Sequence, residues 1–215
     1  RSGDVSIRSS NSRLSSGDIL VQTGNSTSDL GKSGNINIAV GTGSHGSGGS
    51  ISLLAGASTD LSGGAVNIIS GFGSKLGSGK IDIRTSDGGL EGGSGSILVG
   101  SGSTVNGLSG DLTIQTGDSA NGLSGNVLIL AGTGSSGSGG KIQLLAGFTT
   151  DSSASGGQVT VSSGKSASTS SGDIRVLTAS SAIAGDSGSI VLSTGTSSFG
   201  NSGSLFIGTG RANSG

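Results

Sequence analysis

The chain has 215 residues, 47 of them glycine, with no Pro, Cys, Met, Trp or Tyr, a formal net charge of −1 and 11% charged residues. So few charges and only four Phe leave neither the basic surface nor the stacking platform that nucleic-acid binding needs. A chain without Cys has no disulfide and no thiolate nucleophile, and no apolar run approaches the roughly 20 residues of a membrane span. We therefore expect neither a nucleic-acid partner nor a membrane span.

One short phrase is repeated fourteen times along the chain: a leading glycine followed, two and four positions later, by Val, Ile or Leu. The first pair is Val5/Ile7, the last is Leu205/Ile207, and the commonest spacing is 15 residues. Alternation of β-branched and aliphatic residues over five or six positions predicts a strand with one buried face, since a helix would need spacings of three and four. The leading glycines are Gly3, Gly17, Gly34, Gly49, Gly64, Gly79, Gly95, Gly110, Gly125, Gly140, Gly157, Gly172, Gly188 and Gly203.

Bends of about nine Gly- and Ser-rich residues follow the strands, and a second glycine usually stands seven residues after the leading one. Bends of nearly constant length favour a coil that turns the same way each time. We therefore predict an all-β fold, a β-solenoid with parallel ladders built from about 14 strand–bend units, with stacked antiparallel cross-β as the alternative. Residues 35–49 and 126–140 are closely similar, which indicates a six-unit higher repeat of 91–93 residues.

The whole chain, 1–215, is expected to be a single continuous repeat array and a segment of a longer protein. The similarity between 35–49 and 126–140 allows two, three or six strands per coil. Periods of this length are typical of repeat architectures, in which each unit buries its apolar face against its neighbours.

Two other positions recur in the repeats. The residue before the second-glycine position, which is Ser or Ala in three units, is often Thr, at Thr23, Thr85, Thr116, Thr178, Thr194 and Thr209. Several outward positions of the strands are aliphatic or aromatic instead of polar, which indicates either an internal sheet or a surface for lateral packing. These candidate packing residues are Leu20, Leu54, Ile69, Leu98, Leu128, Leu130, Leu145, Leu177, Val191 and Phe206.

No arrangement of residues points to catalysis, a cofactor or a metal. His45 is the single histidine, in a bend without an orienting carboxylate. Asp4, Asp18, Asp111 and Asp173 follow leading glycines, but no second acid recurs beside them as a calcium site would require. Asn25-Ser26-Thr27 is an N-glycosylation sequon, so Asn25 is a candidate glycan acceptor.

Stretches such as 109–134 and 187–210 resemble the Gly/Ser/Thr-rich tandem repeats of large secreted proteins in diatoms and related unicellular algae. The resemblance covers the whole chain and implies an extracellular structural role. We therefore expect a non-catalytic protein that self-associates into filaments or matrix through stacked ladders and lateral aliphatic contacts, with glycans as further partners. The alternative is an adhesin or a carbohydrate-binding surface; an enzyme acting on polysaccharides would need acidic and basic residues clustered on one face, and here they are scattered.

Overall fold

The computed structural model describes residues 3–28 and 30–212. It divides the chain into two compact units, Arg1–Gly110 and Asp111–Gly215. The division falls directly after the leading glycine of the eighth repeat, so each unit contains seven of the aliphatic pairs. The single continuous array stays a prediction.

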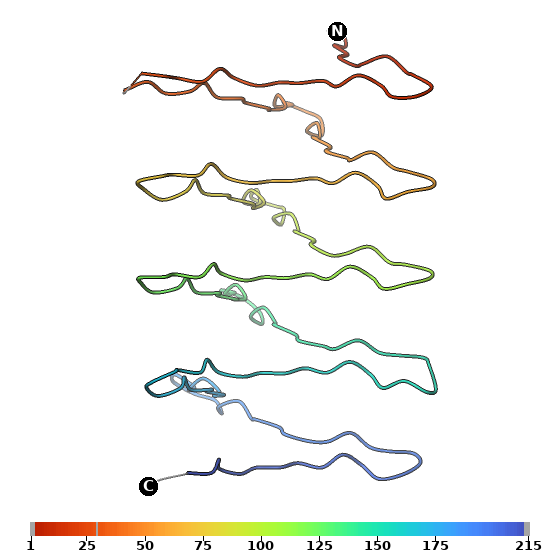
Figure 1. The fold of residues 1–215 in the computed structure, drawn as a ribbon. Helices are drawn as coiled ribbons and strands as arrows, with labels where there is room; N and C mark the ends of the chain where they lie inside the picture. The colour runs from red at the N-terminus through yellow and green to blue at the C-terminus, as the bar shows by residue number, and fades with distance from the viewer. Residues whose placement is uncertain (1–2, 29, 213–215) are drawn as a thin grey trace. The chain divides into compact units, whose positions relative to one another are not determined.

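The described residues contain neither a helix nor a strand, and the predicted β-solenoid is therefore wrong, as is the cross-β alternative. Within each unit the repeats form long extended passes joined by reversals of the chain (Figure 1). The alternating pattern therefore coincides with extended backbone. A strand also needs a neighbouring segment about 4.7–4.9 Å away to pair with its N–H and C=O groups, and the described residues form no such ladder of backbone hydrogen bonds.

Backbone hydrogen bonds between distant residues of the described chain occur at the bases of the bends. The leading glycine of one repeat donates its N–H to the carbonyl of the second glycine of the preceding repeat, at N···O distances of 2.9–3.4 Å. Each such bond closes a bend where its two arms meet, a place that we call the neck of the bend. The necks closed in this way are Gly56–Gly64, Gly71–Gly79, Gly132–Gly140, Gly147–Gly157 and Gly164–Gly172.

Close approach at the neck favours glycine at the leading position. In each repeat, one residue stands six positions after the leading glycine, just before the second-glycine position. If a Cβ were added to the leading glycine of the next repeat, for any from Gly17 to Gly203, it would lie 2.7–3.8 Å from a side-chain atom of that residue. We call that set of residues the neck column; it consists of Ser9, Thr23, Val40, Ala55, Ser70, Thr85, Ser101, Thr116, Ala131, Ala146, Ser163, Thr178 and Thr194. The contact would be shorter than 3.4 Å at six of these glycines and an ordinary van der Waals contact at the other seven, so close packing favours glycine most at the six. These six are Gly34, Gly49, Gly95, Gly125, Gly140 and Gly157.

The second glycines are in a different environment. A Cβ at Gly41, Gly102 or Gly195 would meet no atom within 4 Å, and the same holds for the other glycines at this position. None of them has a positive φ; among the described residues, positive φ occurs within the bends, at Gly107, Gly137, Gly185 and Gly200. The two glycines that mark the ends of a predicted strand therefore differ in their surroundings, and only the leading one has a neighbour across the neck.

No described residue is buried, so the described chain has no hydrophobic core. The accessible surface of the 20.1 kDa chain is 22141 Å². A folded monomer of this mass exposes about 8,700 Å² and its extended chain about 29,000 Å², which means that about a quarter of the extended surface is covered instead of the roughly 70% of a globular domain. The expected strands with one buried face therefore have nothing to bury that face against within the chain.

The neck contact predicts different outcomes for the two glycines of one bend. In Gly157→Ala the new Cβ would lie 3.0 Å from the backbone nitrogen of Gly147 and 3.2 Å from the Cβ of Ala146, whereas a Cβ at position 147 meets nothing within 4 Å. We expect Gly157→Ala to weaken the bond from its own N–H to the Gly147 carbonyl, with about 2- to 10-fold faster exchange of the residue-157 amide proton, because a net hydrogen bond stabilises by about 0.5–1.5 kcal/mol.

Amide hydrogen exchange measured by NMR tests this prediction. Gly147→Ala is the matched control, since it changes the other arm of the same neck, and it should leave the exchange of the residue-157 amide within twofold of the parent. Equal acceleration in both variants would show that the neck contact does not set the requirement for glycine.

Candidate functional site

The aliphatic pairs form two rows with different exposure. The first row, two residues after each leading glycine, is half exposed: from Ile19 to Leu205 its members retain 48–58% of their accessible surface. The second row, four residues after the glycine, is more open, at 63–74% from Val21 to Leu192. The nearly constant exposure within each row shows that every repeat covers its aliphatic side chains to the same incomplete extent.

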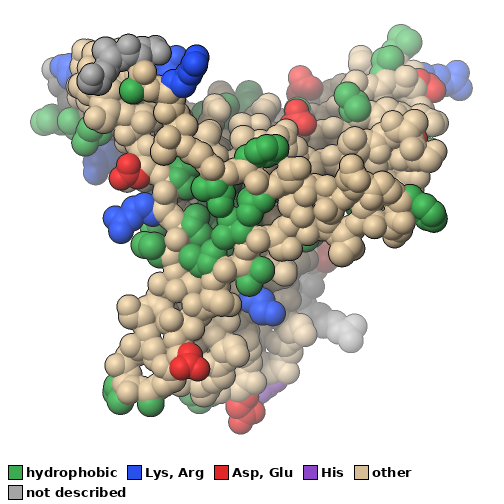
Figure 2. All heavy atoms as spheres, turned by 90° about the horizontal axis from the view of Figure 1, so that it is seen from below, with side chains coloured by type: hydrophobic (Ala, Val, Ile, Leu, Met, Phe, Trp, Pro, Cys, Tyr) green, Lys and Arg blue, Asp and Glu red, His purple; other side chains and the backbone are tan. Residues whose placement is uncertain are grey.

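The ten candidate packing residues are more exposed still, from 73% at Leu177 to 95% at Leu98. The structure gives them no partner within the described chain that covers them, so the internal sheet that was one explanation for their apolar character is absent. Hydrophobic side chains lie open to solvent in the space-filling view, several of them side by side (Figure 2). Their assignment to lateral packing stays a prediction.

The neck column was not recognised as a structural position from the sequence. Its Thr residues were noted only as a recurring column, yet three of the few partly covered residues of the described chain are Ser9, Ser70 and Thr85, all members of this column. The hydroxyl of Thr23 also donates a hydrogen bond to the carbonyl of Gly34, with an O···O distance of 3.1 Å. The restriction of the column to Ser, Thr, Ala and Val, always small or β-branched, was the signal that could have identified it.

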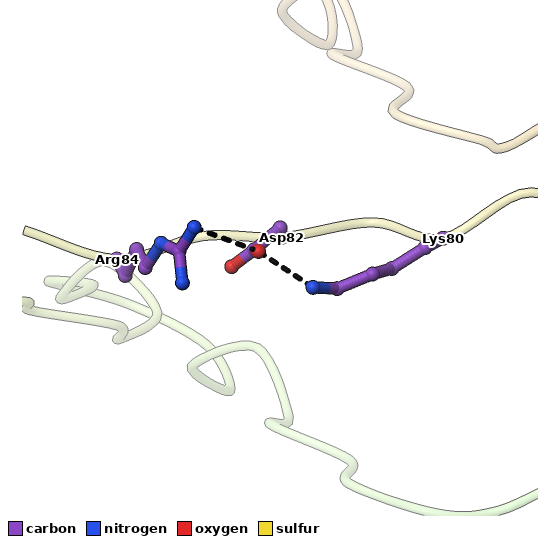
Figure 3. Close-up of polar contacts among 3 residues, drawn as sticks. All are labelled: Lys80, Asp82 and Arg84. Atoms are coloured by element: carbon purple, nitrogen blue, oxygen red, sulfur yellow. Dashed lines mark hydrogen bonds and ion pairs between the residues drawn. The ribbon is translucent and has the colours of Figure 1, made fainter.

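One group of charged side chains lies on an outward face of a repeat. The Nζ of Lys80 is 2.6 Å from the Oδ2 of Asp82, and the Nη2 of Arg84 is 3.5 Å from the same oxygen. The three side chains alternate with Ile81 and Ile83 and lie along one side of the extended segment (Figure 3). The two cations are about four-fifths exposed, so each ion pair contributes about 0–1 kcal/mol and the group has the character of a solvated surface cluster.

The other residues considered for chemistry lie apart from one another in the sequence and are exposed. His45 lies in its bend, and Asp4, Asp18, Asp111 and Asp173 each stand beside a leading glycine. Within residues 3–28 and 30–212, no three His, Asp or Glu side chains come together as a metal site would require. A shallow hollow is lined by Arg8, Ser9, Ser10 and Asn11, which are four consecutive residues of one bend.

Asn25, the candidate glycan acceptor, is exposed in the bend that follows Gly24. Exposure of this kind is compatible with attachment of a sugar, and glycosylation at Asn25 stays a prediction.

The bend that contains Asp151 has its own hydrogen-bonded turn. One carboxylate oxygen of Asp151 accepts bonds from the backbone N–H of Ser153 at 2.8 Å and from the Ser153 hydroxyl at 2.7 Å. The Asp151 N–H in turn donates to the hydroxyl of Thr149 at 3.2 Å. Because the backbone N–H and then the hydroxyl of Ser153 favour the charged form, they lower the pKa of Asp151 below its usual value.

The lowered pKa of Asp151 gives a direction for the pH dependence of this turn. The turn is fully stabilised above the ordinary pKa of Asp, and the stabilisation is lost as the pH falls through the lower pKa of the turn. We expect Ser153→Ala to raise the pKa of Asp151 part of the way to its ordinary value, because the hydroxyl bond is lost while the backbone N–H remains. NMR titration of the Asp151 side-chain carboxyl carbon in both proteins measures the change, and an identical midpoint would contradict the proposed turn.

Two general findings complete the description. The described part of the chain contains no helix long and apolar enough to cross a membrane. No protein-family model, curated protein sequence or solved structure matches the chain. The resemblance to algal secreted repeat proteins therefore remains a prediction from the motifs, and the function has to be argued from the residues.

Proposed function

We propose that this chain is a non-catalytic structural segment that self-associates through its aliphatic rows. The observation that carries the proposal is that the rows recur at regular spacing and remain about half exposed or more, at 48% or above, in each described repeat. Two kinds of contact were expected from the sequence, stacked ladders and lateral aliphatic contacts. Stacked ladders are left out of the proposal because the described chain has no strand. Aliphatic contact between copies needs no strand and is kept.

The amount of exposed apolar surface supports association. Burial of a Val, Leu or Ile side chain stabilises by about 1.5–3 kcal/mol. Because the rows are left about half exposed, much of this burial free energy is still to be gained when the rows are covered. Ordering a residue costs about 1–2 kcal/mol in backbone entropy, which a chain without a core does not recover by itself. Association would cover the rows and supply the missing burial.

The composition supports a structural role in another respect. Proteins with net charge near zero at working pH tend to associate, and this chain combines a formal charge of −1 with few charged residues. The Gly- and Ser-rich bends offer hydroxyls and the exposed Asn25 as attachment points for glycans, in agreement with the proposed extracellular location.

Replacement of Leu residues within the rows tests the role of the rows in association. In the triple variant Leu53→Ser, Leu112→Ser and Leu144→Ser, we expect the protein concentration at half-assembly to rise at least about tenfold. Each buried Leu contributes about 1.5–3 kcal/mol, and 1.4 kcal/mol corresponds to a factor of ten. Analytical ultracentrifugation over a concentration series, with electron microscopy of the assembled material, provides the measurement.

The matched control is Leu61→Ser, Leu108→Ser and Leu123→Ser, which removes three Leu of similar or greater exposure from the bends. We expect this control to assemble within about threefold of the parent concentration, since side chains in the bends lie outside the rows. A parent protein that stays monomeric at high concentration and binds a glycan at a discrete place would replace self-association by the adhesin alternative.

A further inference from the structure

We infer that copies of this chain associate in parallel and in register, so that each repeat lies beside the same repeat of the neighbouring copy. The inference rests on the proposed function and specifies its partner and geometry. Three observations support it: the equal exposure of the aliphatic rows, the lengths of the bends and the distribution of charge.

The first observation concerns what could cover the rows. Along the first row the exposure stays between 48% and 58% for thirteen repeats, from Ile19 to Leu205. A partner that covers all of them must itself present apolar side chains at the same spacing of about 15 residues. A second copy of the chain meets this requirement, because its rows have the same spacing.

Bend lengths determine the alignment of the two copies. The thirteen spacings between leading glycines are 14, 17, 15, 15, 15, 16, 15, 15, 15, 17, 15, 16 and 15 residues. With no offset and the same chain direction, every bend lies beside a bend of equal length. An offset of one repeat matches four of twelve spacings, and a reversed direction matches five of thirteen.

Unequal bends side by side would leave the extra residues of the longer bend without a counterpart in the neighbouring copy. The neck itself is the same for bends of different length, since the bonds Gly56–Gly64 and Gly147–Gly157 are both 2.9 Å long. The arrangement without offset therefore places each neck beside a neck and each bend beside a bend of equal length.

Charge opposes in-register association only weakly. Identical residues placed side by side bring like charges together, which is destabilising. The chain has 11 Lys and Arg and 12 Asp and Glu among 215 residues, so few positions carry this penalty. At the densest cluster, Asp82 lies between Lys80 and Arg84 and contacts both cations, which reduces the net charge of the cluster to +1.

The absence of Cys makes site-directed spin labelling a direct test. Asn67→Cys and Thr113→Cys introduce one thiol in each compact unit, at outward polar positions that leave the aliphatic rows unchanged. Each variant is labelled with a nitroxide, assembled at the concentration established for the parent protein, and measured by continuous-wave EPR. In-register copies place identical labels next to one another, so we expect the three-line spectrum to collapse through spin exchange in both variants. Dilution with a ninefold excess of unlabelled parent should restore the three lines.

The outcomes separate the inference from the proposed function. Assembled material that keeps a three-line spectrum in both variants overturns the in-register arrangement and leaves self-association intact. Spin interaction in a mixture of labelled Ser52→Cys and Asn67→Cys, but in neither alone, overturns it in favour of an offset of one repeat. Failure of the unlabelled parent to assemble in ultracentrifugation overturns the proposed function and the inference together.

Discussion

The organisation of the chain depends on the contact between each leading glycine and the neck-column residue of the preceding repeat. At six of the leading positions an added Cβ would lie closer than 3.4 Å to the Ser, Thr, Ala or Val opposite it, and at the other seven it would be in ordinary contact with that residue. This contact brings together the end of one extended segment and the beginning of the next, and at several necks a hydrogen bond between backbone groups reinforces it. The remainder of the bend has few constraints, and its length and composition vary from repeat to repeat.

Because the necks are the main points of contact between distant residues, the extended segments between them lie open. Their aliphatic residues are partly covered near the leading glycine and increasingly exposed beyond it, which produces the two rows. The neck contacts within one copy determine where the rows begin. The same contacts provide no surface that covers the rows. This geometry distinguishes the chain from a globular domain, in which the same alternating pattern would face a second layer.

In the proposed function, the protein acts by associating with other copies of itself. Repeat proteins obtain stability from interfaces between neighbouring units, and in ordinary solenoids these neighbours belong to the same chain. Here the described repeats form necks within the chain and leave the apolar rows exposed. In the inferred arrangement of copies, unequal bend lengths would align one copy with another. The hydrogen-bonded turn at Asp151 and the ion pairs at Asp82 are features of individual repeats and do not change this general arrangement.

The sequence by itself determined the repeat, the extended course of the aliphatic segments and the positions of the reversals, since all three follow from local pattern: alternation at Val5/Ile7 or Ile81/Ile83 and the Gly- and Ser-rich bends between such pairs. It also identified Leu98 and Phe206 as outward apolar residues, which the structure leaves exposed. The prediction of a β-solenoid was wrong because a ladder depends on which segments meet, and alternation does not encode the distance between passes. Only the tertiary structure showed that Gly157 is confined by Ala146 and Gly147 while Gly147 is free, because two glycines of identical chemistry differ solely in what lies across the neck.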